Sequence, residues 1–160
     1  MDAKQIAKLM ESEPLDVVLS SPYKRAVQTV EPIAQFFQLE VEIVEDFKER
    51  QLAAHPVADF ESAILQVWED ETFAFEGGES NRIAQQRGIH ALRNVLIQYY
   101  NKNIVIGTHG NIMVLIMNYF QKEYDFTFWS NLEMPDIYKL SFDKNELIKI
   151  QRIWRKACSE

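Results

Sequence analysis

An arginine, a carboxylate and a histidine stand at three separate places in the sequence, each shortly after a mostly apolar run. Arg25 could bind phosphate oxygens through two parallel hydrogen bonds. Glu49 could protonate a leaving oxygen, and His109, once protonated, could stabilise negative charge on a transferring group. These residue types together favour phosphoryl chemistry on a small anionic substrate.

Each of these residues also has an ordinary structural interpretation. An arginine early in a helix is usually solvated or ion-paired, and Glu49 lies in the charged stretch 45–50, which by itself predicts a surface position. His109 is less easily explained by packing, because it stands between Thr108 and Gly110 directly after a β-branched run. His109 is therefore the strongest single candidate.

The apolar pattern predicts the elements that must position these groups. Helical spacing predicts helices over residues 2–12, 22–37, 57–70 and 81–99, and an apolar helix that ends near residue 119. Short apolar runs predict strands at 15–19, 41–44 and 104–106, and a hairpin of 136–142 with 146–153. Strands separated by helices indicate an α/β domain with a mainly parallel sheet, to which the hairpin adds an antiparallel element.

Helix starts and buried faces follow from the same pattern. Ser21, with Pro22 behind it, is predicted to cap one helix, and the turn 76–80 to cap another. The large apolar residues predicted on the buried face of helix 57–70 are Phe60, Ile64, Leu65 and Trp68. Those predicted on the buried face of helix 81–99 are Ile83, Ile89, Leu92, Leu96 and Ile97.

The candidate groups all follow predicted strands. In chain order they are Ser21 with Arg25, Glu49 with Arg50, and Thr108 with His109. Ligands of an open parallel sheet bind beyond the C-terminal ends of its strands, and helix N-termini at that edge attract anions. We therefore expect one anion site.

Length and composition limit the class of protein. With 160 residues, the chain is predicted to form a single domain, 1–160. Its 17 basic and 24 acidic residues give a net charge of −7, which argues against general nucleic-acid binding. A local basic pocket remains compatible with a small anion. The six-residue apolar run 112–117 is far shorter than the about 20 residues that span a bilayer. The single cysteine, Cys158, and an N-terminus without a signal-peptide pattern predict a soluble, cytoplasmic protein.

Four segments carry a family resemblance. Residues 20–29, SSPYKRAVQT, resemble the S-S-P-x-x-R-A-x-Q-T segment of the histidine phosphatase superfamily, the phosphoglycerate mutase-like group. Residues 47–50 resemble the stretch with that family's general acid, 78–80 its G-E-S turn, and 108–111 its S-H-G segment, with threonine for the usual serine. The resemblance implies a three-layer α/β/α sandwich, mainly parallel with one antiparallel strand, and hydrolysis of a phosphomonoester through a phosphohistidine.

The resemblance also implies residue roles. Glu49 would be the proton donor and His109 the second histidine of the pocket. The implied phosphate-binding residues are Arg25, Ser21, Thr108 and Gly110. The short spacing from Glu49 to Gly78 resembles the phosphatase branch more than the mutases. The implied ligand is a small phosphorylated molecule or inorganic phosphate, and the chemistry requires no metal or other cofactor.

Aromatic residues from 119 to 129 form a separate cluster in the sequence. They would be core or subunit contact, or an apolar wall for an organic ester.

One departure from the family pattern matters for activity. The family opens with a strand ending in R-H-G, whose histidine is the nucleophile, and no Arg-His-Gly occurs in this sequence. The resemblance therefore implies a chain truncated at its N-terminus, without the first family strand and with little or no activity. The alternatives are a catalytically dead phosphate-binding or assembly module, and a regulatory domain with no anion site.

A missing interior strand would leave backbone groups of its two neighbours unpaired. The strands 103–107 and 136–142 could close up and pair directly, a second copy could supply the pairing, or a separate N-terminal fragment could fill the slot. We expect a homodimer through the unpaired strands or a rearranged sheet.

Overall fold

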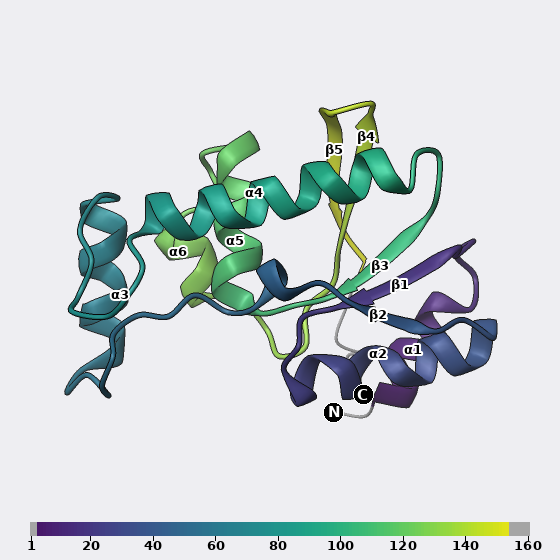
Figure 1. Cartoon of the computed structure of the whole chain (residues 1–160), viewed down its shortest axis with the longest axis horizontal. Helices are drawn as coiled ribbons and strands as arrows, with labels where there is room; N and C mark the ends of the chain where they lie inside the picture. Colours follow the sequence, from purple (N-terminus) through teal and green to yellow (C-terminus); the bar gives the residue numbers. More distant parts are fainter. Residues whose placement is uncertain (1–2, 154–160) are drawn as a thin grey trace, which may run out of the picture.

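A three-stranded parallel sheet lies at the centre of the computed structural model, which describes residues 3–153 (Figure 1). Its strand order is β2-β1-β3, with β1 at Val17–Ser20, β2 at Val41–Ile43 and β3 at Ile104–Gly107. Val18 aligns with Val41 on one side and with Val105 on the other. The three strands predicted from short apolar runs are confirmed, with bounds shifted by one or two residues.

Helices cover both faces of this sheet, because successive strand residues point to opposite sides. Val18 packs against Val30 and Ala34 of α2 (Lys24–Phe37) on one face. Leu19 packs on the other face in a cluster with residues of α4 (Asn81–Gln98) and α5 (Gly110–Phe120). This α/β arrangement agrees with the predicted class.

The remaining helices are shorter. They are α1 (Ala3–Met10), the 3-10 turn η1 (Glu45–Phe47), α3 (Phe60–Glu69) and α6 (Phe126–Ser130). α1 contacts α2, whereas α3 lies at the far end of the molecule and contacts α6 (Figure 1). No helix within residues 3–153 is long and apolar enough to cross a membrane. Cys158 lies outside the described residues.

One of the two predicted caps is confirmed and one is wrong. Ser80 caps α4, where its hydroxyl accepts a hydrogen bond from the Ile83 amide at 3.2 Å. Ser21 does not cap α2, which begins at Lys24 with Tyr23 as the N-cap residue and no side-chain cap. The Ser21 hydroxyl is instead engaged across the sheet by His109.

The predicted buried faces of α3 and α4 are partly wrong. Ile83 is 54% exposed and Ile97 is 69% exposed. The buried residues of α4 are Asn81, Ala84, Gly88, Ile89, Ala91, Leu92 and Val95. On α3 the buried residues are Ala63, Ile64 and Val67, whereas Phe60 and Leu65 are exposed. Alanine and glycine are among the buried residues because they let neighbouring helices pack closely. The prediction considered only large apolar side chains and therefore missed them.

The final hairpin forms a sheet of its own. β4 (Tyr138–Asp143) pairs antiparallel with β5 (Glu146–Arg152), and within the described residues β4 has no ladder to β3. Of the three alternatives for the unpaired strands, direct pairing of 103–107 with 136–142 does not occur, and the prediction of an antiparallel strand within the main sheet is wrong. The short turn closes the hairpin at little entropic cost. β3 and the hairpin instead pack against one apolar cluster, through Ile104 and Ile106 of β3 and Phe142 of β4.

Candidate functional site

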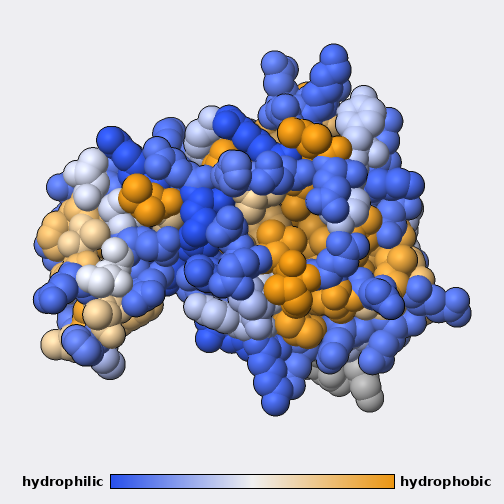
Figure 2. All heavy atoms as spheres, in the orientation of Figure 1, coloured by the Kyte–Doolittle hydropathy of each residue, from blue (hydrophilic) through white to orange (hydrophobic). Residues whose placement is uncertain are grey.

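The C-terminal ends of the three strands meet at one edge of the sheet. The Ser21 amide donates to the Gly107 carbonyl at 2.8 Å, and the Val44 amide donates to the Ser20 carbonyl at 2.9 Å. These ends point toward the side on which α3 lies, and Figure 2 shows the surface hollowed there between α3 and the rest of the molecule. The predicted convergence of the three strand ends is thus present.

His109 lies at this edge, shortly after β3, as the residue before the first turn of α5. It is 8% exposed. Its Nε2 lies 2.7 Å from Ser21 Oγ, and its Nδ1 accepts a hydrogen bond from Arg25 Nε at 3.2 Å. Because Nδ1 is an acceptor, the neutral ring carries its proton on Nε2 and donates it to Ser21.

His109 is neutral in this structure, whereas the role suggested by the sequence requires the protonated form. Burial, and then the positive charge of Arg25, lower the pKa of His109 from 6.5 to about 4. The ring is therefore neutral at neutral pH, and an anion that takes up the charge of Arg25 would be needed to protonate it.

Arg25 reaches this edge from the first turn of α2 and is exposed. Its guanidinium carbon lies 5.3 Å from the centre of the Tyr23 ring, and the Tyr23 ring lies 5.0 Å from that of His109. Of the three nitrogens of the Arg25 guanidinium, only Nε has a hydrogen-bond partner within residues 3–153, so the two terminal nitrogens are free to bind a ligand. That arrangement is suited to a two-point contact with an anion.

Glu49 reaches the same edge from the segment that follows β2. Its Oε2 accepts a hydrogen bond from the Asn111 amide at 3.1 Å, and its Oε1 accepts from the Ile112 amide at 2.9 Å. The carboxylate therefore sits on the N-terminus of α5, where the helix dipole favours negative charge. Burial raises the pKa of Glu49, and the hydrogen bonds from Arg50, Asn111 and Ile112 oppose that rise. The surface position predicted from the charged stretch is wrong, because the side chain is half-buried.

The other two predicted phosphate ligands have different surroundings. The Thr108 hydroxyl donates to the Phe47 carbonyl at 2.8 Å, so it ties the end of β3 to η1. Gly110 is the first residue of α5, and a Cβ there would lie 3.3 Å from Leu132 Cδ1 and 4.0 Å from Trp129 Nε1. The aromatic residues of α6 thus border the N-terminus of α5, and none of them is buried.

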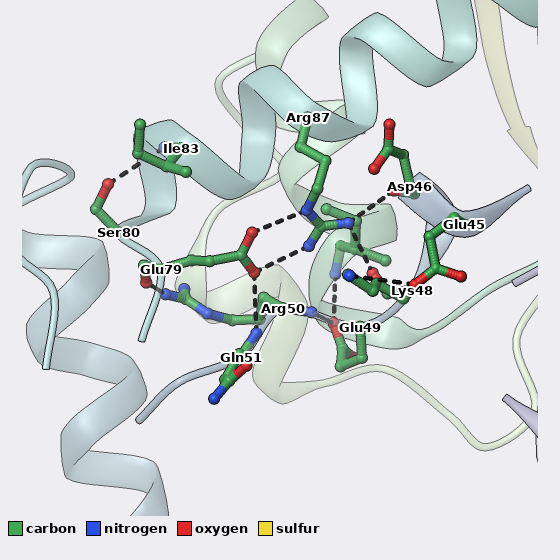
Figure 3. Close-up of polar contacts among 11 residues, drawn as sticks. Glu45, Asp46, Lys48, Glu49, Arg50, Gln51, Glu79, Ser80, Ile83 and Arg87 are labelled. Atoms are coloured by element: carbon green, nitrogen blue, oxygen red, sulfur yellow. Dashed lines mark hydrogen bonds and ion pairs between the residues drawn. The ribbon is translucent and has the colours of Figure 1, made fainter. Parts of the chain in front are cut away.

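Of two arginines next to this edge, Arg50 was expected there together with Glu49, and Arg87 was missed. Arg50 is 5% exposed, and its guanidinium donates to the Asn81 side chain. It also donates to the carbonyl of Glu79, beside which it lies in Figure 3. Arg87 of α4 joins the same network through Glu79. The signal in the sequence was the G-E-S turn at 78–80, followed by an arginine two helical turns into α4. Within the described residues, no group of three or more His, Cys, Asp or Glu is placed to hold a metal ion.

Comparison with solved structures identifies the fold. YhfR of Bacillus stearothermophilus has a TM-score of 0.72 at 19% identity, covering 91% of this chain and 77% of that chain. A phosphoserine phosphatase mutant from Entamoeba histolytica, in complex with phosphoserine, has a TM-score of 0.70 at 22% identity, covering 91% of this chain and 77% of that one. A mycobacterial glucosyl-3-phosphoglycerate phosphatase with inorganic phosphate has a TM-score of 0.68 at 21% identity, with 94% and 79% covered.

Sequence comparison identifies the family. No curated protein matches the chain by sequence. The profile of the Histidine phosphatase superfamily (branch 1) matches residues 1–152, nearly the whole length. The chain therefore belongs to branch 1 of the histidine phosphatase superfamily.

Proposed function

We propose that this chain, as a single domain over 1–160, binds the phosphoryl group of a small phosphorylated molecule or inorganic phosphate at Arg25, Ser21 and His109. The observation that carries this is the exposed fork of Arg25 beside the buried His109, at the edge where all three strands end. Glu49, on the N-terminus of α5, is the proton donor for the leaving oxygen in the family reaction of phosphomonoester hydrolysis. Thr108 and Gly110 follow β3 at the same edge and complete the proposed phosphate-binding set.

The class of ligand is supported by the relatives. One of them was solved with inorganic phosphate and another with phosphoserine, so an anionic phosphoryl group is common to both. The site of this chain has the charge for such a group despite the net charge of −7, because Arg25 is not paired with a carboxylate in residues 3–153. The half-exposed aromatic residues of α6 are suited to an organic ester. The single cysteine supports the cytoplasm as the place of action.

In our proposal, these 160 residues contain neither the nucleophile of the family reaction nor the first family strand. No Arg-His-Gly occurs in the sequence. His109 is a poor substitute because Nδ1 accepts from Arg25 and Nε2 is hydrogen-bonded to Ser21, which leaves no free lone pair for attack on phosphorus. The chain alone then binds phosphate and turns over esters slowly or not at all.

A phosphate-binding or assembly module is the second candidate. It is favoured by the outer edge of β3, which has no ladder partner within the described residues. In this role two copies pair through their unpaired strands as a homodimer, and the anion site serves binding instead of turnover.

Hydrolysis of p-nitrophenyl phosphate tests the proposal, with the chain compared to its His109→Ala and Glu49→Ala variants. We expect no turnover by the chain above that of either variant, because the nucleophile is absent. Turnover that disappears in His109→Ala would show that these 160 residues contain a working active site and would contradict the proposal. In parallel, vanadate should raise the melting temperature of the chain and not that of Arg25→Ala. A chain whose melting temperature does not respond to vanadate would be a regulatory domain with no anion site.

A further inference from the structure

The segment that carries Glu49 is held in place by an arginine from another element. Arg87 of α4 donates from Nη1 to the Asp46 carbonyl at 2.7 Å and to the Lys48 carbonyl at 3.1 Å (Figure 3). Both carbonyls lie on the N-terminal side of Glu49, within three residues of it. A single guanidinium nitrogen thus fixes the backbone that leads into the candidate proton donor.

The other side of the same guanidinium binds a carboxylate. Arg87 Nε and Nη2 donate to Oε1 and Oε2 of Glu79 at 2.8 Å and 2.9 Å, a two-point contact. Glu79 in turn holds the C-terminal side of the segment. Its Oε2 accepts from the Gln51 amide at 3.0 Å, and its own amide donates to the Gln51 carbonyl at 2.7 Å. The Arg87–Glu79 pair therefore grips the chain on both sides of Glu49.

The setting of this pair distinguishes it from a surface ion pair. The side chains of Arg87 and Glu79 are 13% and 20% exposed, whereas those of the Arg82–Glu71 pair at the start of the same helix are 52% and 59% exposed. Exposed pairs contribute little to stability, because water and salt compete with them. A largely dry, two-point contact fixes geometry more strictly.

We propose that Arg87 and Glu79 are positioning residues that hold the Glu49 carboxyl against the first turn of α5 and so set how readily it gives up its proton. The inference rests on the proposed function, in which Glu49 is the proton donor. Arg87 acts through the backbone and not through its charge, because Glu79 neutralises it.

The groups that face Glu49 show why its position decides its acidity. From its own segment, the Arg50 amide and guanidinium charge favour the carboxylate, as do the Asn111 and Ile112 amides of α5, while burial favours the neutral acid. His109, at the start of α5, is neutral in this structure. Burial is the largest of these influences, so a displacement that admitted water would lower the pKa of Glu49 toward 4.5.

The test is a carbon-detected NMR pH titration of the Glu49 carboxyl in the whole chain, beside Arg87→Met and Arg82→Met. The two variants remove one arginine each from the same helix, and only Arg87 reaches the Glu49 segment. We expect the midpoint of Glu49 to fall in Arg87→Met and to stay at the parent value in Arg82→Met. An unchanged midpoint in a folded Arg87→Met, with only the melting temperature lowered, would overturn the proposal in favour of a purely structural role.

A second variant covers the case in which Arg87→Met does not fold. Glu79→Gln keeps an acceptor for Arg87 but removes the charge, and we expect a smaller fall in the same direction. A Glu49 midpoint in folded Glu79→Gln equal to that of the parent chain would overturn the proposal equally. Failure of the proposed function is a separate result, because it would appear as absent phosphate binding while the midpoint of Glu49 still moved with Arg87.

Discussion

The hydrogen bonds of His109 decide how the site responds to an anion. Arg25 donates to Nδ1, so the ring is neutral and held between Arg25 and Ser21. An anion held by the outer nitrogens of Arg25 would offset its positive charge and favour protonation of the ring. The protonated ring would then become a second cationic partner of the phosphoryl group. Phosphate binding in this account is therefore accompanied by proton uptake.

The low pKa of His109 makes the stability of the chain dependent on pH. Between pH 6.5 and about pH 4, His109 is protonated in the unfolded chain but neutral in the folded chain. The free energy of unfolding therefore falls as the pH falls through this range. We expect a loss of about 2 kcal/mol between pH 7 and pH 4.5 in the parent chain that is absent in His109→Asn. Urea unfolding at both pH values measures this. His55 and His90 remain in both proteins, and equal losses in the two would contradict the assignment.

Some properties of the site residues could be predicted from the sequence and others could not. Arg25, Glu49 and His109 could be singled out from their types and positions, and the structure brings all three to one edge. The burial of Glu49 could not be predicted, because the helix N-terminus that binds it lies about sixty residues further along the chain. Arg87 was missed for the same reason, and the contact of Arg50 with the Glu79 carbonyl could not be predicted, since both arginines bind backbone carbonyls far away in the sequence.

The contact between α4 and α5 positions the N-terminus of α5. Glu49 binds the amides of this N-terminus, and His109 immediately precedes it. Gly88 lies in this contact, and a Cβ there would lie 2.8 Å from Ile116 Cγ1 and 3.2 Å from Ile112 Cδ1. The strands could be predicted from the sequence because short β-branched runs are distinctive. The buried face of α4 could not, because its contacts use alanine and glycine where the pattern favours Ile83 and Ile97.

Gly88→Val tests that contact. Ile116 is 7% exposed and has little room to move, so we expect the variant to lose about 1–3 kcal/mol of unfolding free energy through overpacking. Gln86→Val, on the exposed side of the same helix, is the matched control for the helix propensity of valine. Chemical denaturation of both variants measures the difference. A Gly88→Val chain as stable as Gln86→Val would show that α4 and α5 are not closely packed here.

The whole molecule has a sheet that is covered on both faces but open at β3. The amides of Val17 and Ser21 donate to the carbonyls of Asn103 and Gly107. Since alternate residues of a parallel strand bond to opposite sides, the backbone groups of Ile104 and Ile106 point away from β1. Within the described residues these groups have no ladder partner. This open edge is the place for the proposed pairing of two copies.

Amide hydrogen exchange tests the open edge. In dilute solution we expect the Ile104 and Ile106 amides to exchange at least about tenfold faster than the Val105 amide, which bonds to β1. If two copies pair through β3, this difference shrinks as protein concentration rises and the mass measured by light scattering doubles. Slow exchange of Ile106 at a concentration where the chain is a monomer would mean that the edge is already covered, and would refute both the open edge and the dimer proposed from it.

Calorimetric titration with inorganic phosphate tests most directly whether Arg25 and His109 form a phosphate site in this chain. The account predicts one phosphate bound per chain, with affinity reduced about tenfold or more in Arg25→Ala, which corresponds to about 1.4 kcal/mol. Arg82→Ala, which removes an exposed arginine paired with Glu71, should bind phosphate like the parent chain. Equal affinity in the parent chain and in Arg25→Ala, or no binding by the parent chain, would contradict the account.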